Sequence, residues 1–447
     1  MKSFYKRFFL LMIPMALKEL ISSLVNLIDT IMVGRLGETA IAAVGIGNQV
    51  YFLYTVFLFG ISCGAGVFAS QFWGKQNIKE MRSILGLNIL LAFALSLIFV
   101  AAALFIPVPI FHAFHASPEV LRAGVPYLQI VCIGYLATAI TTAFDMSVCC
   151  SERAALPFLV RAVGLVVNIV LNWILIFGHF GVRAMGVNGA AIATVIARFS
   201  ELAVMLAVVY GKKMIQAAGF SQLFSIRKDL VVQFLKTATP VILNEMAWAL
   251  GITAYTWVFA RISSDAMVII TIVQNIERLM LVFFHGGGNA AGVFIGKAVG
   301  AQKYKQAYLY AKKLMFLSSC TALVLSAAFI LLRPVILMPY NISEGVYRQA
   351  MHLLLLVAVM MNVKSMTFLL IVGVFRNGGD TRTACLIDIG SVWCIGVPMV
   401  LLGGFVLHLP LFYVYLMMYA EEAVKLVMAT LHFRSKKWMK NVVSDLS

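Results

Sequence analysis

An aspartate inside an apolar segment is the residue of this chain with the most distinctive chemistry. Asp29 belongs to SSLVNLIDTIMVG, and no basic residue lies within one helical turn of it. Removal from water disfavours the ionised form of a carboxylate, so such a group can take up a proton near neutral pH. It can equally supply the one formal charge of a sodium site. The alternative is a structural carboxylate that accepts hydrogen bonds from neighbouring hydroxyls and amides.

Three polar residues in later apolar segments have the chemistry to complete such a site. Asn168 and Asn172, in VVNIVLNWILIFG, lie four positions apart and therefore share one face of a helix. Thr194 lies in the next segment, GAAIATVIA. Carboxylate, amide and hydroxyl oxygens suit a hard monovalent cation or a proton relay. Ordinary hydrogen bonding between helices is an equally open explanation, because such residues often supply it in membranes.

A second group of polar residues occurs in the C-terminal half. Asn244, Glu245 and Trp248 lie together in TPVILNEMAWALG, and Lys364 lies in MMNVKSMTF. Either Glu245 and Lys364 neutralise each other, or they shape a pocket for a charged substrate. The candidates for a substrate cavity are Asn244, Glu245, Trp248, Lys364, Gln49 and Asn275.

Other charged residues are given no functional role. The pairs Glu277–Arg278 and Arg198–Glu201 are close enough along a helix to pair locally, and Glu421, Glu422 and Lys425 are typical of a polar face of the last span near the membrane interface. The seven cysteines lack metal-ligand spacing. The chain has no HExxH, no GxSxG in a nucleophile setting and no P-loop, so nothing in it favours an enzyme.

Membrane-spanning helices must position these side chains. Hydrophobic residues make up 62% of the 447 positions, charged residues only 12%, and the mean hydropathy is +0.96. Apolar runs of about 20 residues are long enough to cross a hydrocarbon core as helices. We expect an all-α integral membrane protein with about twelve spans: 8–33, 40–72, 84–106, 118–149, 157–178, 186–210, 229–260, 266–297, 312–332, 345–375, 383–406 and 409–433.

The sequence also contains an internal repeat. Residues 64–76 read GAGVFASQFWGKQ, and residues 290–302, which lie 226 positions later, read AAGVFIGKAVGAQ. Six spans in each half mean that both halves enter the membrane in the same direction. The repeats are therefore parallel, related by an axis along the membrane normal.

Basic residues indicate the topology. The net charge is +17, and Lys and Arg gather in alternate short loops. Such an asymmetry marks the cytoplasmic side, so we expect no nucleic acid as a partner. It places both termini in the cytoplasm, with an N-terminal lobe at 1–210, a connector at 211–228, a C-terminal lobe at 229–433 and a basic tail at 434–447.

Several strings together resemble one known transporter family. NLIDTIMVGRLGETAIAAVGIGNQ, NIVLNWILIFG followed by GVNGAAIAT, NEMAWALG, and FRNGGDTRT with the later IGVP are similar to the multidrug and toxic compound extrusion (MATE) family. The resemblance covers almost the whole chain. It implies a V-shaped pair of six-helix lobes around a central cavity, and export of drugs and organic cations driven by sodium ions or protons.

The resemblance also implies residue roles. The family's first-lobe cation site falls on Asp29, Asn168, Asn172 and Thr194. Some members have an aspartate where this chain has Asn172, so only one carboxylate remains here. One branch has its second-lobe acid at the position of Trp248, which makes Glu245 a counterpart by proximity alone, and Lys364 has no acidic equivalent.

We therefore expect a multi-pass plasma-membrane antiporter that works by alternating access. Its partners would be small cationic or amphiphilic substrates and membrane lipid. We expect a monomer with no cofactor other than the coupling sodium ion or proton. The alternative is a flippase for lipid-linked precursors of the same superfamily. Such a protein would line its cavity with cations to hold pyrophosphate, for which this chain offers chiefly Lys364 and Arg161.

Overall fold

The computed structural model describes residues 2–338, 340, 342–444 and 446, and for Lys2, Ser3 and Ser264 only the backbone. The first residue of the predicted N-terminal lobe, residues 339 and 341 of the predicted C-terminal lobe, and residues 445 and 447 of the predicted tail lie outside this range. The chain divides into two compact units. We call Leu17–Phe234 the N-unit, and Met1–Ala16 together with Leu235–Ser447 the C-unit. The lobe and connector boundaries given above stay predictions.

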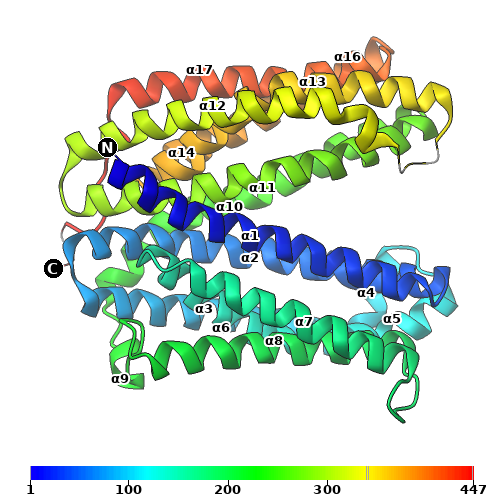
Figure 1. The fold of residues 1–447 in the computed structure, drawn as a ribbon, viewed down its shortest axis with the longest axis horizontal. Helices are drawn as coiled ribbons and strands as arrows, with labels where there is room; N and C mark the ends of the chain where they lie inside the picture. The colour runs from blue at the N-terminus through cyan, green and yellow to red at the C-terminus, as the bar shows by residue number, and fades with distance from the viewer. Residues whose placement is uncertain (1, 339, 341, 445, 447) are drawn as a thin grey trace. The chain divides into compact units, whose positions relative to one another are not determined.

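The apolar segments of the N-unit fold into helices, most of them long (Figure 1). They are α1 (Lys2–Gly34, from residue 17 onward), α2 (Glu38–Lys75), α3 (Ile78–Phe105), α4 (Pro107–Ala113), α5 (Pro118–Val131), α6 (Ile133–Cys150), α7 (Ala155–Phe177), α8 (Gly186–Gly211) and the short α9 (Phe220–Leu223). In this unit α7 packs along α8, α2 along α3, and α6 against both α3 and α8.

The C-unit is also helical. Its helices are α10 (Lys228–Ile262, from residue 235 onward), α11 (Ser264–Gly300), α12 (Tyr304–Leu337), α13 (Glu344–Phe368), η1 (Leu369–Arg376), α14 (Thr381–Ser391), η2 (Val392–Gly396), α15 (Val397–Leu401), η3 (Leu402–Val406), α16 (Leu411–Met418) and α17 (Ala420–Ser435). The η segments are π-helical turns, which occur often at functional sites. Helix α13 packs against α11, α12 and α17.

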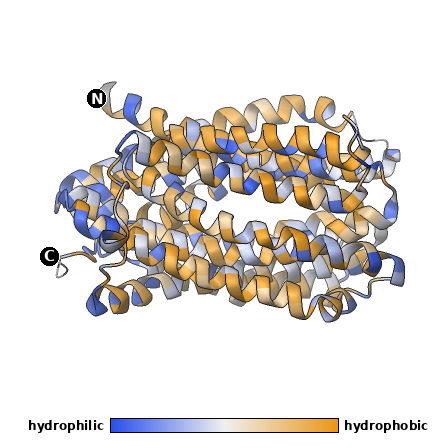
Figure 2. Cartoon of the chain, turned by 90° about the horizontal axis from the view of Figure 1, so that it is seen from below, coloured by the Kyte–Doolittle hydropathy of each residue, from blue (hydrophilic) through white to orange (hydrophobic). Residues whose placement is uncertain are grey.

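The predicted fold class is confirmed. Ten helices within the described part of the chain are long and apolar enough to cross a membrane. The two other predicted spans, 229–260 and 409–433, coincide with α10 and with α16 and α17, which are separated at Tyr419. Hydrophobic residues follow the helices, and hydrophilic residues gather at helix ends (Figure 2). The protein is a multi-pass membrane protein.

The turn between α7 and α8 sets the geometry of the N-unit site. Gly178 ends α7 with φ 78°, and a Cβ there would lie 2.7 Å from the backbone nitrogen of Ala184, so only glycine fits. Gly189 in α8 lies against the carbonyl of Leu175, which a Cβ would approach to 2.6 Å. The two glycines let α8 lie close along α7.

The start of the predicted basic tail is packed against the rest of the C-unit. Trp438 is fully buried, and its ring lies beside Phe375 and Phe433. The backbone nitrogen of Lys440 donates to the carbonyl of Gly378 at 2.7 Å. An aromatic anchor and a backbone hydrogen bond thus fix this part of the chain to the loop between η1 and α14.

Candidate functional site

The structure brings Asp29, Asn168, Asn172 and Thr194 together as one hydrogen-bonded chain. Asn172 Nδ2 donates to Asp29 Oδ1 at 2.5 Å and lies 3.2 Å from Asn168 Oδ1. Asn168 Nδ2 donates to Thr194 Oγ1 at 3.4 Å. The four residues come from α1, α7 and α8. All four lie within the N-unit.

Local structure explains how this group forms. Asn168 and Asn172 are four residues apart on α7, and both are buried. The close approach of α8 at Gly189 sets Thr194, one and a half turns later, beside the same face of α7. Thr194 also donates to the carbonyl of Ala190 at 3.0 Å, which fixes its rotamer.

One buried atom of the group lacks a hydrogen-bond donor. Asn172 Oδ1 has no hydrogen-bond partner among the described residues, although Asn172 is 0% exposed. A buried carbonyl oxygen without a donor is costly, so each such atom calls for an explanation. The oxygen has the right chemistry to bind a cation or a water molecule beside Asp29.

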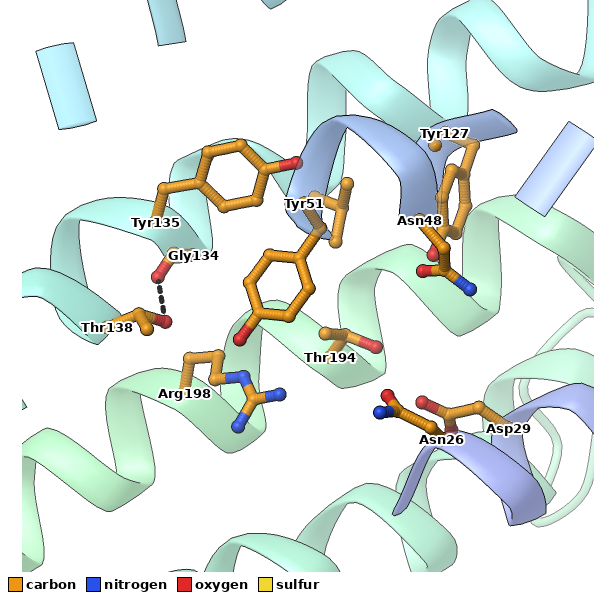
Figure 3. Close-up of a pocket in the computed structure, with 12 residues that line it drawn as sticks. Asn26, Asp29, Asn48, Tyr51, Tyr127, Gly134, Tyr135, Thr138, Thr194 and Arg198 are labelled. Carbon is orange, nitrogen blue, oxygen red and sulfur yellow. Dashed lines mark hydrogen bonds between the residues drawn. The ribbon is translucent and has the colours of Figure 1, made fainter. Parts of the chain in front are cut away.

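A small polar cavity lies next to this group (Figure 3). Its volume is about 30 Å³, and a buried water needs at least about 10–15 Å³. The cavity therefore has room for a small ion or for one or two waters. Its polar lining comprises Asn26, Asp29, Asn48, Tyr51, Tyr127, Tyr135, Thr138, Thr194 and Arg198.

Arg198 is a cavity residue that sequence reasoning assigned no role. The predicted local pair is present, because Arg198 Nη1 donates to Glu201 Oε1 at 3.1 Å. The same carboxylate accepts from Arg161 Nη1 at 2.8 Å. Asp145 completes a buried ion cluster, with Arg161 Nη2 and Lys18 Nζ each 3.9 Å from its Oδ2. The presence of charged residues in apolar segments is a signal that predicted Asp29 and could also have predicted this cluster.

The predicted pairing of Glu245 with Lys364 is wrong. Lys364 Nζ bonds Glu277 Oε1 at 2.6 Å, and Glu245 pairs with Arg376 at 2.7 Å. The reason is helix packing: α13 lies against α11, which carries Glu277. The interpretation of Glu277 as a local partner of Arg278 is wrong for the same reason.

The remaining substrate-cavity candidates are dispersed. Asn244 is 1% exposed and donates through Nδ2 to Asp388 Oδ2 at 2.8 Å. Trp248, Gln49 and Asn275 are exposed. None of the six candidates lines the cavity beside Asp29 or the apolar hollow formed by Met267, Val268, Thr271, Ile272, Tyr340 and Ile342. A role for them in binding substrate stays a prediction.

The polar residues of the last helix are buried inside the C-unit, and their predicted position near the membrane interface stays a prediction. Glu421, Glu422 and Lys425 are between 4% and 8% exposed. Lys425 Nζ lies 2.8 Å from Asp388 Oδ1 and 3.4 Å from Glu422 Oε1. Helix α17 packs against α13 and α14, so its polar face points inward. Sequence reasoning did not single out Asp388, although it lies in the apolar segment TACLIDIGS.

Comparison with known proteins identifies relatives of the whole chain. A family model, MatE, matches residues 14–174 and 240–402. The uncharacterized transporter YisQ of Bacillus subtilis is 25% identical over 413 residues, which are 92% of this chain and 90% of YisQ. The probable multidrug resistance protein NorM of Thermotoga maritima is 23% identical over 440 residues, covering 97% of this chain and 93% of NorM.

Solved structures share the fold. A mutant of the Vibrio cholerae MATE transporter VcmN superposes with a TM-score of 0.90 at 17% identity, covering 99% of this chain and 98% of that one. A MATE protein in the bent conformation superposes with a TM-score of 0.88 at 18% identity, covering 97% and 95%. These two similarities show that the chain has the same fold as those transporters.

Proposed function

Since the chain belongs to the MATE transporter family, we propose that it is a secondary antiporter that exports drugs and organic cations in exchange for sodium ions or protons. The observation that supports this proposal is the N-unit site. Asp29 lines a small polar cavity, and Asn172, which bonds Asp29, has a buried Oδ1 with no donor among the described residues. A sodium ion would be bound by Asp29, Asn168, Asn172 and Thr194. A proton would be bound by the Asp29 carboxylate.

The side chains of the site suit ion exchange. Asp29 Oδ1 is held by Asn172, and the carboxylate faces the cavity (Figure 3). Asn168 and Thr194 keep the amide of Asn172 oriented through their own hydrogen bonds. A cation that binds here replaces the missing partner of Asn172 Oδ1 and neutralises Asp29. The oxygens are held in place before the ion arrives, which lowers the cost of binding.

Coupling follows from differential affinity. Cation binding at Asp29 favours one conformation of the protein, and substrate binding favours another. A ligand shifts a conformational equilibrium only by the difference between its affinities for the two states. Mutually exclusive binding therefore links the two fluxes and gives alternating access.

The substrate class comes from relatives. Several curated relatives are described as probable multidrug resistance proteins, among them NorM of Thermotoga maritima and NorM of Bacillus cereus. We extend that class to this chain as cationic or amphiphilic small molecules. The proposal includes a plasma-membrane monomer with both termini in the cytoplasm, and lobes at 1–210 and 229–433 joined by 211–228.

Observed ion pairs argue against the flippase alternative. That function calls for free cations that hold pyrophosphate, and the two candidates were Lys364 and Arg161. Lys364 is paired with Glu277 at 2.6 Å, and Arg161 with Glu201 at 2.8 Å. Each cation already has a buried carboxylate partner.

Replacement of the Asp29 carboxylate tests the proposal. We expect Asp29→Asn to abolish energised ethidium efflux from cells, because the amide cannot bind a proton or supply the charge for sodium. The matched control is Glu38→Gln, which neutralises an exposed carboxylate nine residues later. Both variants are quantified in the membrane fraction by immunoblot. Normal efflux by Asp29→Asn at wild-type abundance would exclude the mechanism.

A further inference from the structure

The C-unit contains a buried network of charged residues that carries excess negative charge. Its members are Glu277, Lys364, Asp388, Glu421, Glu422 and Lys425. The side chains that form ion pairs in this network are 6% to 25% exposed. Four carboxylates face two ammonium groups, so the network has a formal charge of −2 (4 − 2 = 2). The nearby Arg376 does not change this balance, because Glu245 neutralises it. Charge buried in a membrane protein is costly unless it is paired.

Three of the four carboxylates have an ammonium partner. Glu277 pairs with Lys364 at 2.6 Å, while Asp388 and Glu422 share Lys425 at 2.8 and 3.4 Å. Glu422 also accepts from Thr367 Oγ1 at 2.6 Å. An ammonium group thus lies beside each of these three carboxylates.

Glu421 is the exception. It makes no ion pair within the described part of the C-unit, and its hydrogen-bond partner is the hydroxyl of Tyr255, 2.5 Å from Oε2. The charged groups around Glu421 are Lys364 from α13 and Glu422 and Lys425 from its own helix, while Asp388 from α14 lies near its partner Tyr255. Asp388 and Glu422 are themselves carboxylates. The ammonium groups of Lys364 and Lys425 both have acidic partners that are closer than Glu421.

The backbone encloses this pair of side chains. A Cβ at Gly396, the last residue of η2, would overlap both Tyr255 Oη and Glu421 Oε2. Glycine therefore lets the π-helical turn close over the two oxygens. The close approach leaves no space for the coordination shell of a metal ion on that side, whereas a proton needs none.

An amide that contacts the network through Asp388 has an acceptor without a donor among the described residues. Asn244 is 1% exposed and bonds Asp388 through Nδ2, yet its Oδ1 has no hydrogen-bond partner among the described residues. The network thus has more acceptors than donors. A proton added to a carboxylate supplies a donor and reduces the surplus of negative charge.

The N-unit contains a comparable cluster with the opposite excess charge. Helix α8 begins at residue 186 and ends at 211, while α16 begins at 411 and α17 ends at 435, offsets of 225 and 224 (411 − 186, 435 − 211). At the offset of 224, the ion pair Arg198–Glu201 corresponds to Glu422–Lys425, with the charges reversed. The third partners are reversed as well: Arg161 on Glu201, and Asp388 on Lys425. The N-unit cluster is thus rich in cations, and the C-unit cluster is rich in carboxylates.

We propose that Glu421 is a second proton-binding site, separate from Asp29, at which a carboxylate in the C-unit takes up an exchangeable proton. The proton comes from water at the membrane surface and forms an O–H bond to a Glu421 oxygen. The Tyr255 hydroxyl keeps its own proton and holds the acid by a hydrogen bond. The site is defined by proton binding alone, so it does not depend on transport or on Asp29.

Infrared spectroscopy of the purified protein in lipid tests this site. A protonated carboxyl group gives a C=O stretch that a carboxylate lacks. We expect a carboxylic-acid band in wild type at neutral pH that disappears in Glu421→Gln. The matched control is Glu422→Gln, which removes the adjacent buried carboxylate that has an ammonium and a hydroxyl partner and should leave the band in place. Asp29→Asn should leave this band too.

Further arms keep the test decisive. Tyr255→Phe retains the acid but removes its hydrogen bond, so the band should shift in frequency even if Glu421→Gln fails to fold. Added sodium at constant ionic strength should not reduce the band. The proposal is overturned by persistence of the band in Glu421→Gln, its loss in Glu422→Gln, its removal by sodium, or an unshifted band in Tyr255→Phe. A failed efflux assay for Asp29→Asn would not affect these results.

Discussion

At the scale of single residues, Asp29 and Arg198 contribute opposite charges to one cavity. Two guanidinium groups, those of Arg161 and Arg198, share the carboxylate of Glu201, so Arg198 is only partly neutralised. Its remaining charge stabilises an ionised, ion-free Asp29 and repels a cation that enters the cavity. In the proposed cation site, Arg198 would therefore oppose ion binding and favour ion release.

We expect Arg198→Met to increase the affinity of the N-unit site for the coupling cation. Removal of a unit charge near a partly buried site changes the binding free energy by ~1–2 kcal/mol, or about fivefold or more in affinity. The measurement is the sodium or proton concentration that gives half-maximal dye efflux. Arg183→Met, which removes an exposed cation in the turn between α7 and α8, is the control. An unchanged or weakened affinity in Arg198→Met would refute this role.

At the scale of elements, Asp380 connects α14, α17 and the chain that follows. It caps α14 by accepting from the Thr383 backbone nitrogen at 3.4 Å. It also accepts from Thr383 Oγ1 at 2.9 Å and contacts His432 Nε2 at 2.9 Å and Lys440 Nζ at 2.8 Å. Burial opposes ionisation of this carboxyl, but the hydrogen bonds from His432, Lys440 and Thr383 outweigh it and lower the Asp380 pKa to about 2. The ionised carboxylate thus binds Lys440 of the tail to the start of α14.

We expect Asp380→Asn to lower thermal stability in a pH-dependent way. The folded pKa of Asp380 is about 2 and its ordinary value is 3.8, so its contribution is fully present above pH 3.8 and is lost as the pH falls towards 2. The contribution is about 2 kcal/mol. Melting in detergent should show a lower Tm for Asp380→Asn at pH 6, with the difference from wild type shrinking below pH 4. A difference in Tm between Asp380→Asn and wild type that does not change with pH would contradict this role of the ionised carboxylate.

Elements were far easier to predict from the sequence than the contacts between them. Long apolar runs define membrane helices because backbone groups in hydrocarbon must bond internally. Asp29 and its partners were found because a carboxylate or an amide in an apolar run must have a function or a partner. The partners of Lys364 and the inward face of α17 were missed, since helix packing decides them. No local pattern distinguishes Glu277 from Glu245 as the partner of Lys364.

At the scale of the whole molecule, the chain repeats its helices but not its polar chemistry. The glycine-rich strings recur after 226 positions, as expected of residues that let helices pack closely. The N-unit has Asp29 beside a cluster rich in cations, whereas the C-unit has a cluster rich in carboxylates. The two units therefore carry clusters of opposite excess charge.

The most direct test of the coupling role of Asp29 is dye transport into everted membrane vesicles under imposed gradients. Sodium and proton gradients are applied separately to vesicles that contain wild type or Asp29→Asn at equal abundance. We predict that at least one gradient drives dye accumulation by wild type and that neither does so for Asp29→Asn. Accumulation by Asp29→Asn that responds to the same gradient as wild type would contradict the account.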